Sequence, residues 1–524
     1  MHAATTASPR RLAVPPHIES DHVVPPSPTE SAFLREVRTG VRRPSFTGRR
    51  TRIIATIGPA SDNEASLKAM GEAGMDVARV SLAHGSIPES IDRIHRIRAV
   101  LPRIGILADL PGPKVRSTSF GPGGADLVDG EHVTLSTAAA TPESSAARIG
   151  VSLDEGLSSL GVGDLVVIGD GGLSLQVVAP GDDEVVCEIK TGGHVQGRPG
   201  ITVPSHVLRV PSPTPEDLER IVALTADGVE AIAISFVRTP DDVEAVRDAI
   251  GSNPCLLVAK IETREAVENI DAIVRSADAV MVARGDLGVR LPLEDVPSLQ
   301  KQIIRAGVRF GRPVITATQM LESMVHANVP TRAEVSDVAN SVLDGTSAVM
   351  LSGETAIGKH PVGAVEAMAR IVTRAERDFD YLGWGASLGL QDVSGDRSST
   401  LRVTAAITGA GWRAALEEDA AAIIACSSTG TTVRAISRFR PSMPIVAVVK
   451  SSYRARQLQM SWGVARVVVH PSEDSYVQTY AAIDHLLAEG IVAPGDVVVV
   501  LAGSRETPTP ITDTVRIVRV SERV

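Results

Sequence analysis

The sequence predicts an α/β protein built on a (β/α)8 TIM barrel, with a small β-barrel lid domain inserted into it and a C-terminal α/β domain. Three observations favour this fold class. Eight short apolar runs alternate with helix-length amphipathic segments, a Gly-, Val- and Asp-rich stretch interrupts them after the third run, and a second group of apolar runs follows the eighth. Aromatic residues make up only 3% of the chain, so Val, Ile, Leu and Ala must fill the core, as in parallel sheets buried on both faces.

The composition is that of a globular protein with several domains. A chain of 524 residues is too long for one hydrophobic core, and 43% hydrophobic with 22% charged residues is ordinary for globular domains. A net charge of −10 argues against nucleic acid as a partner, and every apolar run is shorter than the roughly 18 residues of a membrane span. Cys187, Cys255 and Cys426 lie in separate apolar runs without metal-ligand spacing, which indicates buried thiols in a reducing compartment, the cytoplasm.

Residues 1–48 differ in composition from the rest of the chain. They are rich in Pro, Ser, Thr and Arg and show no sustained hydrophobic periodicity. They also lack the apolar core of a secretory signal, and their acidic residues argue against a transit peptide. We expect a disordered or loosely docked tail.

The barrel is predicted for residues 49–116 and 211–385, where each apolar run ends in polar or glycine-rich sequence. The predicted strands are Ile53–Ile57, Val77–Leu82, Gly105–Leu110, Ala231–Phe236, Leu256–Ile261, Ala279–Ala283, Val314–Ala317 and Ala348–Leu351. Because active sites of such barrels form at the C-terminal strand ends, the polar residues should meet where chemistry occurs. A doubly wound open sheet is the alternative, but it does not readily use eight consecutive units of this kind.

Two further domains are predicted from changes in pattern. Residues 117–210 contain alternating strands at Asp164–Ile168, Leu173–Val178 and Glu184–Ile189, which indicate a small β domain placed as a lid over the site. A Gly-, Ser- and Asp-rich linker over residues 386–400 then leads into a C-terminal α/β domain, residues 401–524. Its predicted strands are Ala422–Ala425, Ile445–Val449, Ala465–Val469 and Asp496–Leu501.

Three charged residues at predicted strand ends carry the chemistry. Lys260 and Glu262 are two apart and so share one face of a strand, and Asp286 follows a glycine that lets backbone approach a ligand. A lysine beside two carboxylates suits a divalent cation held against a phosphate, since the carboxylates bind the ion and the ammonium neutralises the transferred group. A structural ion pair at the barrel rim is the alternative interpretation of these segments.

Six longer motifs give the sequence a family resemblance. They are Ala55-Thr-Ile-Gly-Pro59, Leu257-Val-Ala-Lys-Ile-Glu262, Val282-Ala-Arg-Gly-Asp-Leu-Gly288, Thr316-Ala-Thr-Gln-Met-Leu-Glu-Ser-Met324, Arg332-Ala-Glu-Val-Ser-Asp-Val-Ala-Asn340 and Met350-Leu-Ser-Gly-Glu-Thr-Ala356. From about Thr51 to the C-terminus the chain resembles the pyruvate kinases. The resemblance implies Mg²⁺-dependent phosphoryl transfer from phosphoenolpyruvate to ADP, giving pyruvate and ATP at the end of glycolysis.

The resemblance also implies roles for individual residues. Glu262 and Asp286 would bind Mg²⁺, for which Mn²⁺ can substitute. Lys260 would stabilise the phosphoryl group in transfer, and Arg79 would clamp the phosphate with its guanidinium fork. The substrate carboxylate would be held by the backbone N–H groups around Ala283, Gly285 and Asp286, with Thr318. Thr318, or a relay through Ser352 and Glu354, would protonate the enolate carbon.

Four positions match the nucleotide site of the family. Arg116 and His84 would lie near the ADP phosphates and ribose, and Pro59 would border the adenine. Arg198 belongs to the inserted domain and would reach the nucleotide when the lid closes.

The chain departs from the family pattern where many members bind K⁺. Ala83 and Leu110 stand at positions that usually supply side-chain oxygens, while Asp109 is retained. Lys114 replaces the usual glutamate of the Gly-Pro-Glu-Ile-Arg motif. A tethered ammonium can take the place of the lost cation, so we expect that K⁺ is not required.

The loop Ser427-Ser-Thr-Gly-Thr-Thr432 follows a predicted strand and resembles the family's effector site. Its members are Ser427, Ser428, Thr429, Gly430, Thr431 and Thr432. The resemblance implies a phosphorylated effector and a homotetramer. Two alternatives stay open: a catalytically silent paralogue that binds metabolites and regulates a partner, and a different enolate-stabilising enzyme on a related barrel.

Overall fold

The computed structural model describes residues 48–83, 85–113, 115–153, 157–169, 172–204, 207, 211–390, 399–503 and 511–521. The predicted N-terminal tail lies outside these residues except for Gly48. A membrane-spanning helix is not found in the described part of the chain.

Eight parallel strands close into a barrel, as predicted. They are β1 (Arg52–Thr56), β2 (Val77–Ser81), β3 (Gly105–Asp109), β12 (Ala231–Ile234), β13 (Leu256–Ile261), β14 (Ala279–Ala283), β15 (Val314–Ala317) and β16 (Ala348–Leu351). Their order around the barrel is β1-β16-β15-β14-β13-β12-β3-β2. The strands therefore follow the chain order once around, with the inserted segment between β3 and β12.

The two faces of each barrel strand are both apolar and serve different contacts. Ile53 and Ala55 of β1 belong to the core between the strands and the helices. Ile54, between them, belongs to a second core inside the barrel, together with residues such as Val258 and Met281. Successive side chains point to opposite faces of a strand, so burial on both faces gives the continuous apolar runs seen in the sequence.

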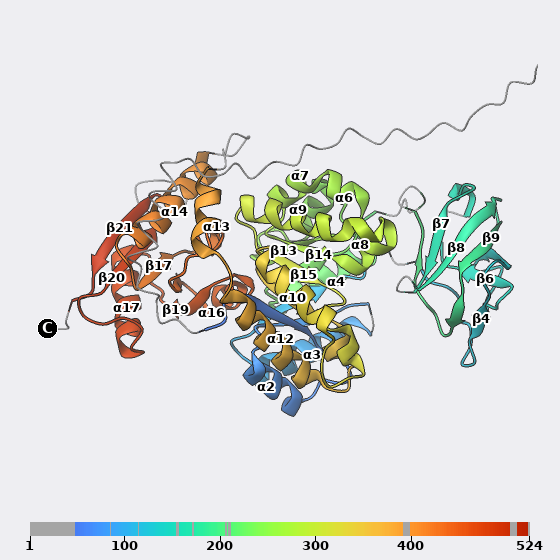
Figure 1. Cartoon of the computed structure of the whole chain (residues 1–524), viewed down its shortest axis with the longest axis horizontal. Helices are drawn as coiled ribbons and strands as arrows, with labels where there is room; N and C mark the ends of the chain where they lie inside the picture. Colours follow the sequence, from blue (N-terminus) through green and yellow to red (C-terminus); the bar gives the residue numbers. More distant parts are fainter. Residues whose placement is uncertain are drawn as a thin grey trace, which may run out of the picture. The chain divides into compact units, whose positions relative to one another are not determined.

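Helices cover the outside of the barrel (Figure 1). Their bounds are α2 (Glu64–Ala73), α3 (Ile87–Val100), α4 (Pro215–Ala226), α5 (Pro240–Ile250), α6 (Arg264–Glu268), α7 (Ile270–Ser276), α8 (Arg284–Arg290), α9 (Val296–Arg309), α10 (Arg332–Leu343), α11 (Gly353–Ala356) and α12 (Pro361–Glu376). Several begin at sequence-encoded caps: Ser86 and Glu89 form a capping box on α3, and Thr331 and Glu334 form one on α10. α9 packs against β14 and β15.

The inserted segment forms an all-β unit with its own apolar core. Its strands are β4 (Ala125–Leu127), β5 (His132–Thr137), β6 (Arg148–Val151), β7 (Leu165–Ile168), β8 (Leu173–Ala179), β9 (Glu184–Thr191), β10 (Gly193–Val195) and β11 (Ile201–Thr202). In the described residues they make an open six-stranded sheet, β11-β7-β8-β9-β5-β6, and a separate β10-β4 ribbon, where the sequence predicted a small β-barrel.

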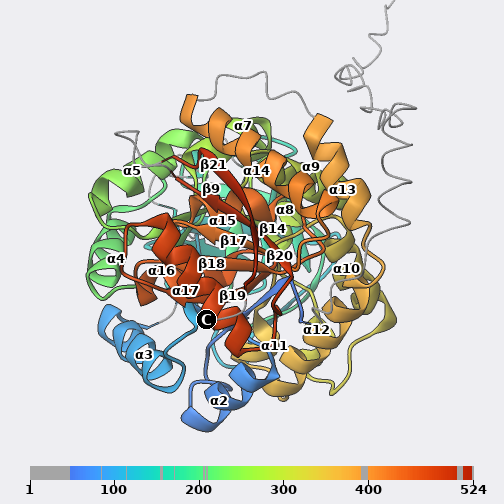
Figure 2. The same ribbon diagram turned by 90° about the vertical axis from the view of Figure 1, so that its left-hand side faces the viewer.

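The C-terminal unit is a five-stranded sheet flanked by helices (Figure 2). The strands are β17 (Ala422–Cys426), β18 (Ile445–Val449), β19 (Val464–Val469), β20 (Val497–Ala502) and β21 (Thr514–Arg519), and the helices are α13 (Tyr381–Leu390), α14 (Ser399–Glu417), α15 (Thr431–Ser437), α16 (Ser452–Gln457) and α17 (Ser475–Ala488). The sequence analysis missed β21, an antiparallel edge strand paired with β20. The predicted linker, residues 386–400, is helical at both ends, where it overlaps α13 and α14. Its residues 391–398 lie outside the described residues.

The C-terminal unit closes the base of the barrel. Met460, from the short helix η4 (Leu458–Met460), joins the apolar cluster inside the barrel. Next to it, Arg52 of β1 donates a hydrogen bond from Nε to the carbonyl oxygen of Ser461 at 3.0 Å. Asp76, before β2, holds Arg52 in place with a 2.8 Å ion pair and also accepts a hydrogen bond from the backbone N–H of Ile53 at 2.8 Å.

We expect the buried carboxylate of Asp76 to stabilise the fold above the pH at which an unfolded aspartate titrates. Burial raises its pKa, but the charges of Arg49 and Arg52 and the Ile53 N–H outweigh burial and leave the pKa lowered. Its contribution is therefore complete above about pH 4, the unfolded value, and is lost as the pH falls through the folded pKa. Asp76→Asn should cost about 3–5 kcal/mol at neutral pH, because it leaves the arginine charges without their partner.

Urea unfolding across pH tests this expectation. Asp92→Asn, at an exposed position on α3, is the matched control and should leave the free energy of unfolding nearly unchanged. An Asp76→Asn protein as stable as the parent at pH 7 would contradict the account.

Candidate active site

Polar residues extend the inner face of the barrel at the C-terminal ends of its strands. Each lies two residues beyond an apolar residue of the inner cluster, so strand periodicity points both side chains inward. The pairs are Ile54 and Thr56, Val77 and Arg79, Leu107 and Asp109, Ala233 and Ser235, and Val258 and Lys260. The apolar residues thus form the floor of the site, and the polar residues form the layer above it.

Lys260 joins these side chains into one buried network. Its Nζ lies 2.8 Å from Oε1 of Glu262 and 3.3 Å from Oδ1 of Asp109. The other oxygen of Asp109 accepts a 2.7 Å hydrogen bond from Nε of Arg79. Arg79 also donates from Nη1 to the hydroxyl of Thr56 at 2.9 Å. The structure therefore brings together four of the predicted residues from three strands and adds Thr56.

Ser235 is a network member that the sequence analysis missed. Its hydroxyl accepts a 2.6 Å hydrogen bond from Nζ of Lys260 and donates at 2.7 Å to the carbonyl oxygen of Leu110. The available signal was its place as the first residue after β12, on the inward register of Ala233. Three oxygens therefore fix the Lys260 ammonium.

The network favours the charged forms of Lys260 and Asp109 in a buried site. Burial raises the pKa of Asp109, but Arg79 and then Lys260 outweigh it and leave that pKa lowered. Burial opposes the charge of Lys260, whereas Asp109, Glu262 and Asp286 together raise its pKa above the ordinary value. Glu262 shows the opposite balance, because burial and the charge of Asp286 raise its pKa despite the attraction of Lys260.

Glu262 and Asp286 fit a divalent cation. Asp286 lies in the first turn of α8 and makes no hydrogen bond or ion pair with the described residues, and its charge acts on Glu262. Oε1 of Glu262 is buried and, despite its ion pair with Lys260, has no hydrogen bond of acceptable geometry. A cation between two such carboxylates would relieve their repulsion. Groups of three or more His, Cys, Asp or Glu side chains arranged to hold a metal ion are not found among the described residues, and Mg²⁺ typically uses one or two carboxylates, completing its shell with water and phosphate oxygens.

A strained turn carries Thr318 to the start of α8. Thr318 and Gln319 have φ values of 68° and 51°, in the left-handed region that non-glycine residues rarely adopt. The Thr318 hydroxyl accepts a 2.7 Å hydrogen bond from the Gly285 N–H and donates to the carbonyl oxygen of Ala317 at 2.6 Å. Thr318 and Gly285, which the family resemblance assigns to the substrate carboxylate site, therefore bind each other in this structure.

Arg284 holds that turn in place. Its Nη1 lies 2.7 and 2.6 Å from the two carboxylate oxygens of Asp337, and its Nη2 donates a 2.7 Å hydrogen bond to the carbonyl oxygen of Thr318. Arg284 therefore ties the turn after β15 to α10. Strain at a ligand site persists only where surrounding contacts enforce it, and Arg284 supplies them.

Glu354 is bonded to the backbone through both of its carboxylate oxygens. Its two carboxylate oxygens accept hydrogen bonds from the N–H groups of Leu321, at 3.0 Å, and Ser352, at 2.7 Å. The side chain is fully buried. Glu354 therefore joins the segments after β15 and β16, and this geometry favours a positioning role over the predicted proton relay.

Arg290, at the end of α8, is a second residue that the sequence analysis missed. Its guanidinium lies 5.0 Å from the ring centre of Phe236 and donates a 3.2 Å hydrogen bond to the carbonyl oxygen of Val203. Burial lowers its pKa, and the charges of Glu262 and Asp286 oppose that effect. Arg290 therefore connects the carboxylate pair with the end of the inserted segment.

The predicted nucleotide residues are only partly assembled in the described structure. Arg116 pairs with Gly200 in a short β-bridge, and its guanidinium lies 3.4 Å from the carbonyl oxygen of Arg198. Pro59 and the Arg198 side chain are exposed. His84 and Lys114 lie outside the described residues.

The predicted effector loop lies between β17 and α15. Ser428 and Thr429 are exposed, whereas Ser427, Gly430 and Thr432 are buried. Hydroxyls of Thr429 and Thr431 lie 2.9 Å apart, and that of Thr432 lies 2.6 Å from the hydroxyl of Thr512. Gly430 has a φ of 82°, so a glycine suits the turn into the helix.

Comparison with known proteins identifies the family. The family models described as "Pyruvate kinase, barrel domain" and "Pyruvate kinase, alpha/beta domain" match residues 48–365 and 405–518. The chain belongs to the pyruvate kinase family.

Similar pyruvate kinases come from several bacteria. That of Clostridium acetobutylicum is 36% identical over 480 residues, which cover 90% of this chain and 99% of the relative. That of Mycobacterium tuberculosis is 37% identical with the same coverages, and that of Geobacillus stearothermophilus is 38% identical over 87% of this chain and 78% of its own length. This pyruvate kinase is thus a phosphotransferase whose charged network occupies the catalytic end of the barrel.

Ser235→Ala should lower the kcat of this pyruvate kinase about tenfold or more, because the Lys260 ammonium loses one of its three oxygens and can shift toward Glu262. Pyruvate formation measures the effect, while Ser235→Thr, which keeps the hydroxyl, should restore most of the rate. Ser158→Ala, at an exposed serine, is the control. Equal kcat values for Ser235→Ala and the parent would show that Ser235 does not position Lys260.

Proposed function

We propose that this pyruvate kinase transfers the phosphoryl group of phosphoenolpyruvate to ADP, depends on Mg²⁺ bound by Glu262 and Asp286, and does not require K⁺. The observation that carries the proposal is the Lys260 network, which holds a buried ammonium between two carboxylates at the catalytic end of the barrel. In the reaction, the bond between phosphorus and the enol oxygen breaks and a bond to a terminal oxygen of ADP forms. The enolate carbon then takes a proton to give pyruvate.

The cation-binding pair and the two basic residues have separate roles in this proposal. When bound, Mg²⁺ supplies positive charge that stabilises the phosphoryl group and the enolate oxygen. Lys260 neutralises charge on the group in transfer, and Asp109 and Ser235 fix its ammonium in advance. Arg79 contacts Asp109 through Nε and Thr56 through Nη1. It binds phosphate oxygens through its other nitrogen, Nη2.

Thr318 is the proposed proton donor to the enolate carbon. Its hydroxyl proton is directed at the carbonyl oxygen of Ala317 in this structure, so donation requires the hydroxyl to rotate. The Gly285 N–H that Thr318 now binds would then be released to the substrate carboxylate, with the neighbouring N–H groups of Ala283 and Asp286. Glu354 would keep Ser352 and the segment after β15 in position.

The inserted segment 117–210 is proposed to act as a lid over the nucleotide. The contact between Arg116 and the Arg198 carbonyl and the contact between Arg290 and the Val203 carbonyl support this role, because they join the segment to residues near the site. Arg198 and His84 would contact ADP, with Pro59 beside the adenine. The remaining domain boundaries, the homotetramer, the effector at residues 427–432 and a cytoplasmic location are proposed on family resemblance.

The proposed independence from K⁺ rests on the contacts of Asp109 and on two residues that follow it in the sequence. Asp109 is committed to Arg79 and Lys260, which leaves it little capacity for a further cation. Leu110 offers no side-chain oxygen, and Lys114 supplies a tethered charge instead.

We expect equal pyruvate formation in matched Na⁺ and K⁺ buffers, whereas Lys114→Glu should become K⁺-dependent or lose activity, since it restores a carboxylate and removes the ammonium. Lys68→Glu on α2 controls for the charge change. Strong K⁺ activation of the parent would contradict the role of Lys114 and leave the phosphoryl transfer standing. No turnover in either buffer would contradict the transfer itself.

Glu262→Gln and Asp286→Asn should each lower kcat/KM by about a thousandfold and weaken Mn²⁺ binding, because each removes one of two carboxylate ligands. Electron paramagnetic resonance of free Mn²⁺ measures binding independently of activity. Glu268→Gln, an exposed carboxylate on α6, is the control for both measurements. Unchanged Mn²⁺ affinity in both variants would exclude this pair as the cation site.

A further inference from the structure

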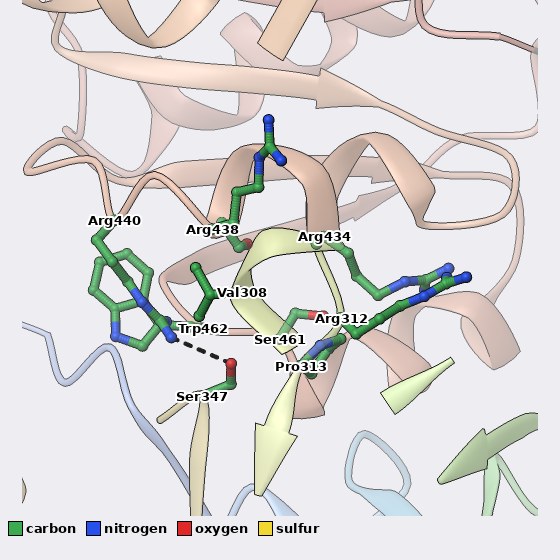
Figure 3. Close-up of a pocket in the computed structure, with 11 residues that line it drawn as sticks. Val308, Arg312, Pro313, Ser347, Arg434, Arg438, Arg440, Ser461 and Trp462 are labelled. Atoms are coloured by element: carbon green, nitrogen blue, oxygen red, sulfur yellow. Dashed lines mark hydrogen bonds between the residues drawn. The ribbon is translucent and has the colours of Figure 1, made fainter. Parts of the chain in front are cut away.

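A cavity between the barrel and the C-terminal unit is lined by four arginines (Figure 3). Arg312 comes from the turn between α9 and β15, and Arg434 comes from α15, with Arg438 and Arg440 just beyond that helix. The cavity comprises about 260 Å³ of space free of protein atoms, part of it open to solvent. It lies apart from the Lys260 network, with which it shares no residue.

Arg434 is a buried cation without a carboxylate partner. Its side chain is only 6% exposed, and no carboxylate of the described residues lies within ion-pair distance of it. Nη2 makes a weak hydrogen bond, 3.5 Å long, to the Thr431 hydroxyl. Nη1 has no hydrogen-bond partner. Buried charges are ordinarily paired, so an unpaired guanidinium facing a cavity indicates a missing anion.

Arg312 adds a second positive charge beside Arg434. Figure 3 draws the two side chains extending in the same direction. Arg312 is anchored by hydrogen bonds to the carbonyl oxygens of Val274 and Arg275, at 3.3 and 3.1 Å. Burial lowers the pKa of Arg434 to about 10, attraction by Asp278 opposes this effect, and repulsion by Arg312 adds to it.

The other two arginines each stack on an aromatic ring, and Nε and Nη1 of the buried Arg440 have no hydrogen-bond partner. Arg440 lies 4.6 Å from the Trp462 ring centre and donates hydrogen bonds to the Gly345 carbonyl and, at 3.3 Å, the Ser347 hydroxyl. Arg438 lies 4.7 Å from the ring centre of Phe439 and points away from Arg434 in Figure 3. They add positive charge to the cavity, and Arg312 and Arg434 stand out because their side chains lie side by side.

We propose that Arg312 and Arg434 bind a phosphate-type oxyanion, either free phosphate or the phosphate group of a small organic ester. Guanidinium groups match phosphate oxygens in charge and geometry. The cavity is narrow and partly open to solvent, so it favours a small anion over a nucleotide. Because one arginine comes from each unit, the bound anion joins the barrel to the C-terminal unit.

This site differs from the predicted effector loop in its binding groups. The loop offers hydroxyls and backbone N–H groups, whereas the cavity offers guanidinium groups, one of them from the barrel. Arg434 nevertheless touches the loop through Thr431, and a Cβ added to Gly430 would lie 2.8 Å from Nη1 of Arg434. An anion in the cavity can therefore affect the loop through one side chain.

Isothermal titration calorimetry of the full chain with inorganic phosphate tests the proposal, with NaCl at matched ionic strength as the reference. Arg312→Met and Arg434→Met should each weaken phosphate binding about tenfold, since each removes a charge-assisted contact. Arg413→Met, at an exposed arginine on α14, removes the same charge elsewhere and should bind as the parent does. Glycerol 3-phosphate is titrated in parallel, and tighter binding than inorganic phosphate would assign the site to an organic ester.

Thermal unfolding without phosphate separates binding from folding. Arg434→Met should unfold at the same temperature as the parent or higher, because it removes an unpaired buried charge. A lower unfolding temperature together with unchanged phosphate affinity would overturn the proposal. Loss of phosphate binding in Thr429→Ala but not in Arg312→Met would also overturn it, because the anion would then lie in the loop.

Discussion

The ion pairs of the Lys260 ammonium are the interaction on which the site depends. A buried lysine is stable only with compensating charge, and Asp109 and Glu262 provide it at 3.3 and 2.8 Å. The same pairs fix Arg79 through Asp109 and leave Glu262 beside Asp286. One buried charge thus organises the groups proposed to bind phosphate and those proposed to bind the cation.

Barrel geometry explains why these groups meet. Strand periodicity places every second residue inside the barrel, so apolar residues such as Val258 are followed by functional residues such as Lys260 one layer higher. The closed sheet then brings strands that are far apart in sequence to a common rim. A rigid apolar floor, completed by Met460 from the C-terminal unit, supports the charged layer.

The contact between the barrel and the C-terminal unit combines two kinds of chemistry. Met460 and the hydrogen bond from Arg52 to Ser461 are satisfied contacts that hold the units together. Arg434 and Arg312, by contrast, leave positive charge at the same boundary. An anion bound at this boundary would stabilise it, because the anion would offset the repulsion between Arg312 and Arg434.

The sequence by itself determined the barrel, its eight strands, the Lys260, Glu262 and Asp286 cluster and the family, because periodicity and motif spacing are local properties. Tertiary structure decided what depends on neighbours from distant segments. The register of β12 against β13 places Ser235 beside Lys260. The fold also brings the segment after β15 to Glu354, which accepts a hydrogen bond from its backbone. The arginine cavity likewise combines α15 with the α9–β15 turn, which are more than a hundred residues apart, so its unpaired charge exists only once the chain has folded.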